Sequence, residues 1–223
     1  MEWIAVGDVH EDTANLGRIP GVGAADGLIL SGDLTNRGSE AMARRVLGAA
    51  LAANPKVYAQ LGNMDTEVVP RVIDELCVNI HVRAVSLDSG SEHGSLCIFG
   101  VGMSTFTPFG TPSEVSDEQL GRWLDQVWVK AEDFDHHLAV IHNPPLDTTT
   151  DRLGSGAHVG SQAVRDFLEH AKPEVCITGH IHESRGLDRV GETLVINPGM
   201  PSQGGYVRIT WADGTLSAAL ETL

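Results

Sequence analysis

The chain has 223 residues, of which 42% are hydrophobic and 20% charged, so it can bury a sizeable core and is not compositionally disordered. Thirty acidic residues against fifteen basic ones give a net charge of −15, which disfavours binding to a nucleic-acid duplex. The length is ordinary for one α/β domain, and no repeat, low-complexity tract or charge block divides it. We therefore predict a single domain over residues 1–223.

The first seven residues are apolar apart from Glu2, but they lack a basic region, and no later apolar run approaches eighteen residues. We therefore expect neither a signal peptide nor a membrane span. Cys77, Cys97 and Cys176 are odd in number and widely spaced, without a Cys-x-x-Cys pair. This usage indicates reduced core cysteines and predicts a cytoplasmic location.

Strand and helix patterns alternate in the first third of the chain. Short apolar runs predict strands at 3–6, 27–30 and 56–61. A segment rich in Ala, Leu, Met and Arg that stops before Pro55 predicts a helix at 39–54. A second helix is expected at 66–79, with Pro70 in its first turn. The order is that of a βαβαβ unit.

The rest of the chain shows patterns typical of both helices and strands. Ser116 and Gln119 match a capping box that opens a helix with an apolar stripe from Leu120 to Ala131, its tryptophans in the core. Another helix is expected at 161–171, before Pro173. Further strands are predicted at 82–87, 96–101, 138–141, 175–178, 194–196, 206–211 and 216–220, with a polar turn at 89–95 and loops at 103–112 and 147–160.

Potential metal ligands come directly after predicted strands, at the sheet edge where α/β folds place their sites. A glycine or a proline pair beside each group lets the backbone turn sharply there. The seven residues, with the strands they follow, are Asp8 and His10 (3–6), Asp33 (27–30), Asn63 (56–61), His142 (138–141), and His180 and His182 (175–178).

Two carboxylates, four imidazoles and one amide oxygen suffice for two divalent ions if one carboxylate bridges them and solvent fills the remaining positions. Two metals roughly 3.5–4 Å apart hold a bridging hydroxide, polarise a phosphoryl group and stabilise the oxygens of an in-line displacement. The residue types therefore predict a two-metal hydrolase. Simple turn capping by Asp8, Asp33 and Asn63 is the alternative, but it does not explain four histidines at three strand ends.

The motifs Gly-Asp-x-His, Gly-Asp, Gly-Asn-x-Asp, His and Gly-His-x-His occur in this order from Asp8 to His182. At these residues the sequence resembles the calcineurin-like metallophosphoesterase family, and it looks closest to the small single-domain prokaryotic members. Each fragment alone is weak, but five in order are highly specific. The resemblance implies an α/β fold, a four-layer α/β/β/α sandwich with mixed sheets and a metal site at strand ends.

The same resemblance implies roles for the candidate residues. The first metal would be held by Asp8, His10 and His182, the second by Asn63, His142 and His180, and both would be bridged by Asp33. The metal would be Mn, Fe, Zn, Co or Ni, since mixed nitrogen and oxygen sites bind all of these. Arg37 and His158 are candidates to contact the substrate phosphate; a surface position is an equal interpretation for His158.

Two positions depart from the family pattern. Met64 stands where the family often has a histidine that protonates the leaving group, and a thioether carries no ionisable proton. Asn36 stands before Arg37 in place of an acid, so the usual orienting partner of that arginine is altered. Asp65 is expected either to orient His10 or a metal-bound water, or to cap the following helix. The methionine favours phosphodiesters or activated leaving groups.

The predicted function is hydrolysis of small phosphodiesters or phosphomonoesters by in-line attack of a metal-bridging hydroxide. A nuclease of the same fold is the first alternative, opposed by the charge of −15 and by only three lysines. A non-catalytic scaffold, such as the retromer subunit of this fold, is the second. Scaffold members tend to lose ligands, whereas all seven are retained here. No nucleic-acid or membrane partner is expected.

Overall fold

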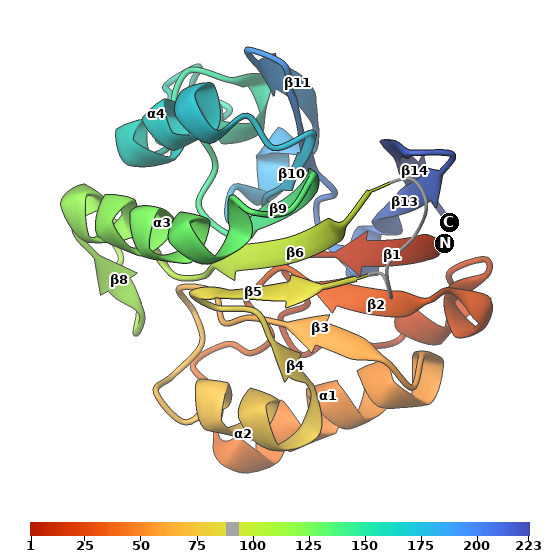
Figure 1. Ribbon diagram of the computed structural model, residues 1–223. Helices are drawn as coiled ribbons and strands as arrows, with labels where there is room; N and C mark the ends of the chain where they lie inside the picture. Colours follow the sequence, from red (N-terminus) through yellow and green to blue (C-terminus); the bar gives the residue numbers. More distant parts are fainter. Residues whose placement is uncertain (88–93) are drawn as a thin grey trace.

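The computed structural model describes residues 1–87 and 94–223, so residues 89–93 of the predicted polar turn lie outside the described part. Two six-stranded mixed sheets dominate it (Figure 1). The first sheet has the order β14 (Thr215–Thr222), β13 (Gly205–Ala212), β1 (Glu2–Val6), β2 (Gly27–Leu30), β3 (Val57–Ala59) and β4 (Val78–Asn79). The second has the order β11 (Gly186–Val190), β12 (Thr193–Asn197), β10 (Val175–Ile177), β9 (His136–Ile141), β6 (Leu96–Val101) and β5 (Arg83–Ser86).

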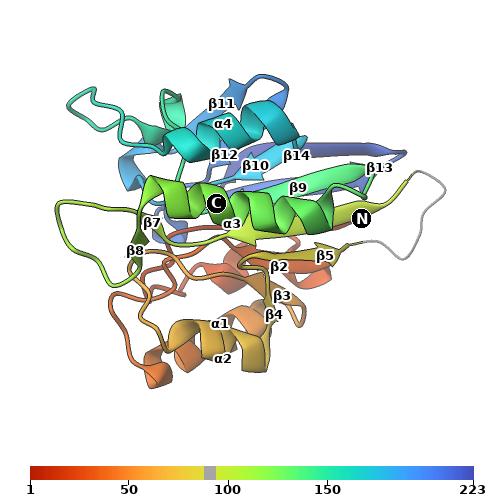
Figure 2. The same cartoon turned by 60° about the vertical axis from the view of Figure 1, so that its left-hand side comes forward.

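The helices lie on the outer faces of the sheets; in Figure 2, α1 and α2 lie below the first sheet, and α3 and α4 lie in front of the second. Their bounds are α1 (Glu40–Ala53), α2 (Val69–Leu76), α3 (Asp117–Ala131) and α4 (Gln162–Ala171). A small parallel pair, β7 (Ser104–Thr105) and β8 (Glu114–Val115), brackets a loop beside them. Short 3₁₀ turns occur at Leu16–Arg18, Val22–Ala24, Thr149–Asp151, His182–Ser184 and Pro201–Gln203.

Three apolar clusters hold these parts together, and the alternation of side chains along each strand creates them. In β1, Ile4 and Val6 pack toward α1 and α2, whereas Trp3 and Ala5 enter the cluster between the two sheets. The third cluster lies under α3 and α4, where the tryptophans of α3 pack against it while staying partly exposed. The predicted mixed α/β fold is confirmed.

Helix starts follow the sequence signals closely. The hydroxyls of Ser39, Ser116 and Ser161 accept hydrogen bonds from backbone N–H groups three residues later, at 3.4, 3.2 and 3.0 Å. Only half of the expected capping box forms in α3, because the Gln119 side chain accepts from Arg122 instead.

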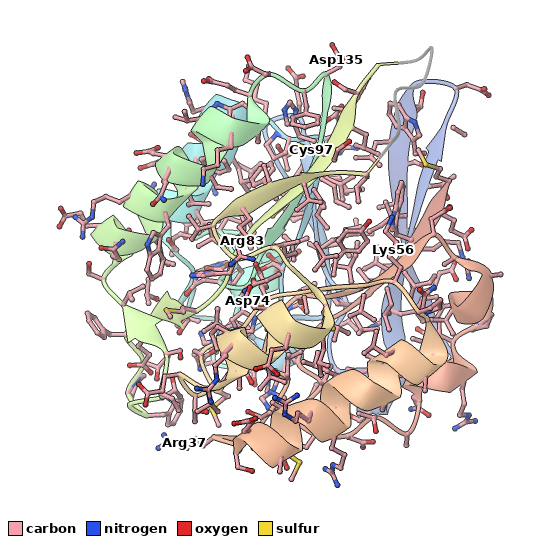
Figure 3. All side chains as sticks on the ribbon, turned by 60° about the horizontal axis from the view of Figure 1, so that its bottom comes forward. Arg37, Lys56, Asp74, Arg83, Cys97 and Asp135 are labelled. Atoms are coloured by element: carbon pink, nitrogen blue, oxygen red, sulfur yellow. The ribbon has the colours of Figure 1, made fainter. Side chains whose placement is uncertain are left out.

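Several elements differ from the sequence expectation, among them the second helix and the unpredicted strands β4, β7, β8 and β11. The second helix ends at Leu76, earlier than predicted, because Val78 and Asn79 add a strand beside β3. An ion pair of 2.8 Å between Asp74 and Arg83 then ties α2 to β5 (Figure 3). Strand β11 was not predicted, since it is partly exposed and carries charged residues. No helix in the described residues is long and apolar enough to cross a membrane.

Candidate metal centre

The parallel strands of both sheets end at one edge, and the seven candidate ligands converge there. Asp8, Asp33 and Asn63 come from loops after β1, β2 and β3 of the first sheet. His142 and the pair His180 and His182 come from loops after β9 and β10 of the second sheet. Because the two sheets pack face to face, residues as far apart in the sequence as Asp8 and His182, 174 positions (182 − 8), come together.

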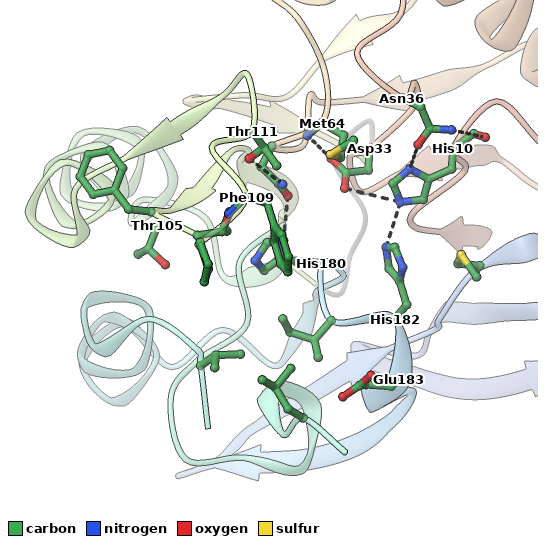
Figure 4. Close-up of a pocket in the computed structure, with 18 of the residues that line it drawn as sticks. His10, Asp33, Asn36, Met64, Thr105, Phe109, Thr111, His180, His182 and Glu183 are labelled. Atoms are coloured by element: carbon green, nitrogen blue, oxygen red, sulfur yellow. Dashed lines mark hydrogen bonds and ion pairs between the residues drawn. The ribbon is translucent and has the colours of Figure 1, made fainter. Parts of the chain in front are cut away.

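The first group consists of Asp8, His10, Asp33 and His182, whose nearest nitrogen and oxygen atoms all lie within 4.8 Å of one another. The Nε2 atoms of His10 and His182 face each other at 2.8 Å (Figure 4). His10 Nε2 is 3.6 Å from Asp33 Oδ2, and His182 Nε2 is 3.6 Å from Asp8 Oδ1. This set of two carboxylates and two imidazoles could hold a divalent ion.

The second group is centred on the amide oxygen of Asn63. This Oδ1 atom lies 3.0 Å from His142 Nε2 and 2.7 Å from His180 Nδ1. The other carboxylate oxygen of Asp33, Oδ1, is 3.5 Å from His142 Nε2. Asp33 thus directs one oxygen toward each group.

The hydrogen bonds of two of the rings leave their Nε2 atoms facing the centre. His10 Nδ1 lies 2.7 Å from Asn36 Oδ1, and His142 Nδ1 lies 3.1 Å from the Ser31 carbonyl. Both partners are acceptors, so each Nδ1 is the donor, and the other ring nitrogen, Nε2, faces the centre. Asp8 Oδ2 is also buried without a hydrogen-bond partner among the described residues. These atoms are all electron-pair donors, as a metal requires.

The local backbone is shaped to present these side chains. Asp8 and Asp33 have φ values of 52° and 50°, in the left-handed region that few non-glycine residues adopt. A Cβ added at Gly62 would lie 2.1 Å from Asp33 Oδ1, and one at Gly179 would lie 2.8 Å from Asp8 Oδ2. Gly62 and Gly179 therefore provide room for the carboxylates. The sharp backbone turns are made by the ligand residues Asp8 and Asp33 themselves.

The charges at the centre shift several pKa values. Burial would raise the pKa of Asp8, but His182, His142 and the His180 N–H outweigh it and lower that pKa to about 2. Burial opposes the charged form of His142 as well, yet the carboxylates of Asp33, Asp8 and Asp65 raise its pKa to about 9. The carboxylates therefore make the electrostatic environment of the centre favourable for a positively charged group.

Asp65 holds the loop of the bridging residue and does not contact His10. Its buried carboxylate accepts from the backbone N–H groups of Leu34, Thr35 and Gly62 at 2.8–3.0 Å. Burial and the nearby Asp33 raise its pKa to about 6. Asp65 therefore does not orient His10, which is held by Asn36, and it does not cap α2, whose N-cap position is occupied by Val68 without a side-chain hydrogen bond.

The two expected phosphate-contacting residues lie in different surroundings. Arg37 lines a cavity beside the metal centre, and its Nη2 donates to the carbonyls of Phe109 and Gly110 at 3.3 and 2.9 Å. His158 does not line this cavity, and its Nδ1 lies 2.6 Å from the buried carboxylate of Asp151. The structure thus brings Arg37, but not His158, to the site.

Sequence reasoning missed the residues that orient Asn63. The Asn63 Nδ2 group donates to Thr111 Oγ1 at 3.0 Å, and this hydroxyl donates to Glu114 Oε1 at 2.6 Å. The relay fixes which amide atom is the oxygen that faces the two imidazoles. Thr111 and Glu114 are 48 and 51 positions from Asn63 (111 − 63 and 114 − 63), and no local motif marks them.

A substitution at Asn36 tests the orientation of His10. We expect Asn36→Leu to weaken metal affinity roughly 10- to 100-fold, because the Nδ1–H of His10 loses its acceptor. Asn36→Asp keeps an acceptor there and should retain affinity. Calorimetric metal titration of the three proteins measures this. Equal affinity in all three would show that the hydrogen bond does not control His10.

Together, the mixed α/β fold and the cluster of imidazoles and carboxylates define a candidate metal-binding site at the strand ends. The sequence profile described as calcineurin-like phosphoesterase matches residues 1–184. An uncharacterized protein, MJ1162 of Methanocaldococcus jannaschii, is 32% identical over 186 residues, which is 82% of this chain and 81% of that protein. The chain belongs to the calcineurin-like phosphoesterase family.

Solved structures show the same fold. The protein TT1561 of Thermus thermophilus superposes with a TM-score of 0.69 at 17% identity, covering 98% of this chain and 97% of that one. A dimetal phosphatase from Danio rerio gives 0.65 at 12% identity, covering 100% and 96%. A 5'-nucleotidase described as putative, from Staphylococcus aureus, gives 0.60 at 17% identity, and the match covers 99% of this chain but 52% of that one.

Proposed function

We propose that this protein is a dinuclear metal-dependent phosphoesterase that hydrolyses small phosphodiesters or phosphomonoesters. The observation that carries the proposal is the position of Asp33, whose two carboxylate oxygens face two separate donor groups at 3.5 and 3.6 Å. In this assignment one metal is held by Asp8, His10 and His182, the other by Asn63, His142 and His180, and both by Asp33. Its cytoplasmic location stays a prediction.

The donor set suits Mn, Fe, Zn, Co or Ni, because it combines imidazole nitrogens with carboxylate and amide oxygens. When bound, a metal pair supplies an activated water for in-line attack and neutralises charge on the phosphoryl oxygens. The chain positions this chemistry through Asp33, which is itself held by a hydrogen bond of 2.8 Å from the Met64 N–H. Asn63 is held by Thr111, so its oxygen keeps facing the centre.

The cavity beside the centre fits a small substrate. Its volume is about 810 Å³, and Arg37 provides the single Lys or Arg side chain among the described residues of its wall. One guanidinium suits one phosphate group. A nuclease would need several cations to follow a nucleic-acid backbone, so that alternative is disfavoured. The buried, unpaired Asp8 Oδ2, which is costly unless a cation binds, disfavours a scaffold that has lost its metal.

Metal removal and reloading test the proposal. We expect chelated protein to be inactive and to regain activity with about two equivalents of Mn²⁺, Co²⁺ or Zn²⁺ per chain. Metal content is measured by plasma mass spectrometry, and turnover is measured by phosphate or alcohol release from a panel of monoesters and diesters. Tight metal binding without turnover of any ester would support the scaffold. Hydrolysis of DNA or RNA in preference to small esters would support the nuclease.

A further inference from the structure

We propose that Phe106 and Phe109 form an aromatic platform that selects phosphoesters whose organic group is a planar aromatic ring. This inference deepens the proposed function and rests on it. The platform lies in the loop between β7 and β8, at the wall of the cavity that also contains His10, Asp33 and His182.

The exposure of the two phenylalanines is the first observation. Phe106 is 71% exposed and Phe109 is 79% exposed, the highest values among the large hydrophobic residues of the described chain. Both line the cavity, whose wall also includes Leu153, Val159 and Met200. Exposed apolar side chains gathered at one cavity, rather than scattered singly, indicate a binding surface.

Hydrogen bonds anchor the loop, so the backbone that carries the two phenylalanines is held beside the cavity. Arg37 donates to the carbonyls of Phe109 and Gly110, and Figure 3 shows Arg37 near the start of α1, at the end of the molecule where this loop lies. Glu114 Oε1 accepts from Thr107 Oγ1 at 2.5 Å and from the Thr111 N–H at 2.8 Å. Partial burial raises the pKa of Glu114, but these bonds outweigh it and lower that pKa to about 2. The Glu114 anchor is therefore charged at neutral pH.

The anchor also connects the platform to the metal centre. Thr111 Oγ1 accepts from the Asn63 amide at 3.0 Å, and Thr105 donates from its N–H to Asn143 Oδ1 at 2.9 Å, next to His142. Figure 4 shows Phe109 and Thr111 on one side of the pocket and the facing rings of His10 and His182 on the other. An ester with its phosphate at the metals would therefore extend its organic group toward the phenylalanines.

The chemistry of the wall favours a ring over a charged or hydroxylated group. Phenyl faces stack on planar rings, and such stacking is worth about 1–3 kcal/mol per base, or roughly 5- to 150-fold. The single guanidinium, Arg37, leaves no further Lys or Arg side chain in the described wall for a second phosphate. Two sources supply such a ring: a nucleobase of a mononucleotide, or the aryl group of another phosphoester.

The experiment uses ester pairs that separate ring stacking from leaving-group acidity. Benzyl and cyclohexylmethyl esters have similar alcohol leaving groups and similar size, but only the first is planar and aromatic. Adenosine monophosphate and glycerol phosphate, or their methyl diesters, form the second pair. We expect Phe106→Leu and Phe109→Leu each to lower kcat/KM for the aromatic member on the order of tenfold. The cyclohexylmethyl and glycerol esters should change less than about twofold, since Leu keeps an apolar surface.

Val129→Ala is the matched control, because Val129 is 67% exposed on α3 and lies outside the cavity wall. Parallel loss on both members of a pair, or no loss on either, would overturn the platform while leaving the phosphoesterase assignment intact. Loss on the adenosine ester alone would identify a nucleobase, and loss on both aromatic esters a general aryl site. A changed oligomeric state without changed selectivity would show that the phenylalanines form a protein interface instead. Absence of turnover in the metal-loaded parent protein would contradict the proposed function itself.

Discussion

Asp33→Asn should abolish phosphoester turnover and reduce the metal content from about two per chain toward zero. Asp33 is the residue that faces both donor groups, so neutralising it weakens two sites at once. The loss should exceed the roughly 100-fold that removal of a hydrogen-bonded neighbour of a metal ligand typically costs. The backbone should be unaffected, because the Asn oxygen can still accept from the Met64 N–H.

The stability of the metal-free protein distinguishes a lost ligand from a misfolded one. Burial and the charge of Asp33 both raise the pKa of Asp65, so the two carboxylates repel each other. Removing the charge of Asp33 relieves this repulsion but also removes the ion pair with His142, so the metal-free unfolding temperature should change little. Asp125→Asn, an exposed substitution on α3, controls for the change in net charge. Near-normal metal content and activity in Asp33→Asn would contradict the bridging role.

The sequence identified the position of the centre because local chemistry marks it. Each candidate ligand comes after an apolar run that becomes a buried strand, such as β2 before Asp33 and β9 before His142. Two sheets then bring these strand ends to one edge. The resemblance to the family motifs added the expected assignment of each ligand to one of two metals. The fold class followed from the same alternation of apolar runs and helical segments.

The supporting contacts were not predictable in the same way, because they join residues far apart in sequence. Asp65 was expected as a partner of His10, whereas the path of the loop after β2 places Asn36 there and turns Asp65 to the backbone. The hydrogen bonds from Arg37 to the Phe109–Gly110 carbonyls depend on a loop that begins more than 60 residues later. Turn residues indicate where such a loop lies, but not which side chain holds it.

The backbone conformation of the ligand residues was not predictable from the sequence either. Glycines beside the ligands suggested that glycine makes the sharp turns, yet Asp8 and Asp33 themselves have positive φ. Gly62 and Gly179 serve instead as spaces for carboxylate oxygens. Propensity favours glycine at positive φ, and tertiary contacts at this centre override it.

Met64→His should selectively accelerate the hydrolysis of esters with poor leaving groups. Met64 lines the cavity, and its side chain has no proton to give to the departing oxygen. The parent enzyme should therefore depend steeply on leaving-group acidity, with nitrophenyl esters turned over much faster than alkyl esters. General acids typically contribute about 10²- to 10⁴-fold, so the histidine should raise alkyl-ester turnover within this range if its ring reaches the leaving oxygen.

The backbone of residue 64 is fixed on both sides, which makes the substitution interpretable. Its N–H donates to Asp33 Oδ1 and its carbonyl accepts from the Arg37 N–H, at 2.8 and 2.9 Å. A new side chain there should enter the cavity from the same direction as Met64. Met64→Leu is the control, because it changes the packing without adding an acid.

The measurement is a Brønsted series of kcat/KM against leaving-group pKa for the three proteins at matched metal occupancy. A steep slope in the parent and in Met64→Leu, together with a shallower slope in Met64→His, would show that the parent lacks a leaving-group acid. A shallow slope in all three would show that the proton comes from another group. Arg37 in the cavity wall or a metal-bound water would then be the donor to test, and His158 only if its loop moves, because Asp151 now holds its ring outside the wall.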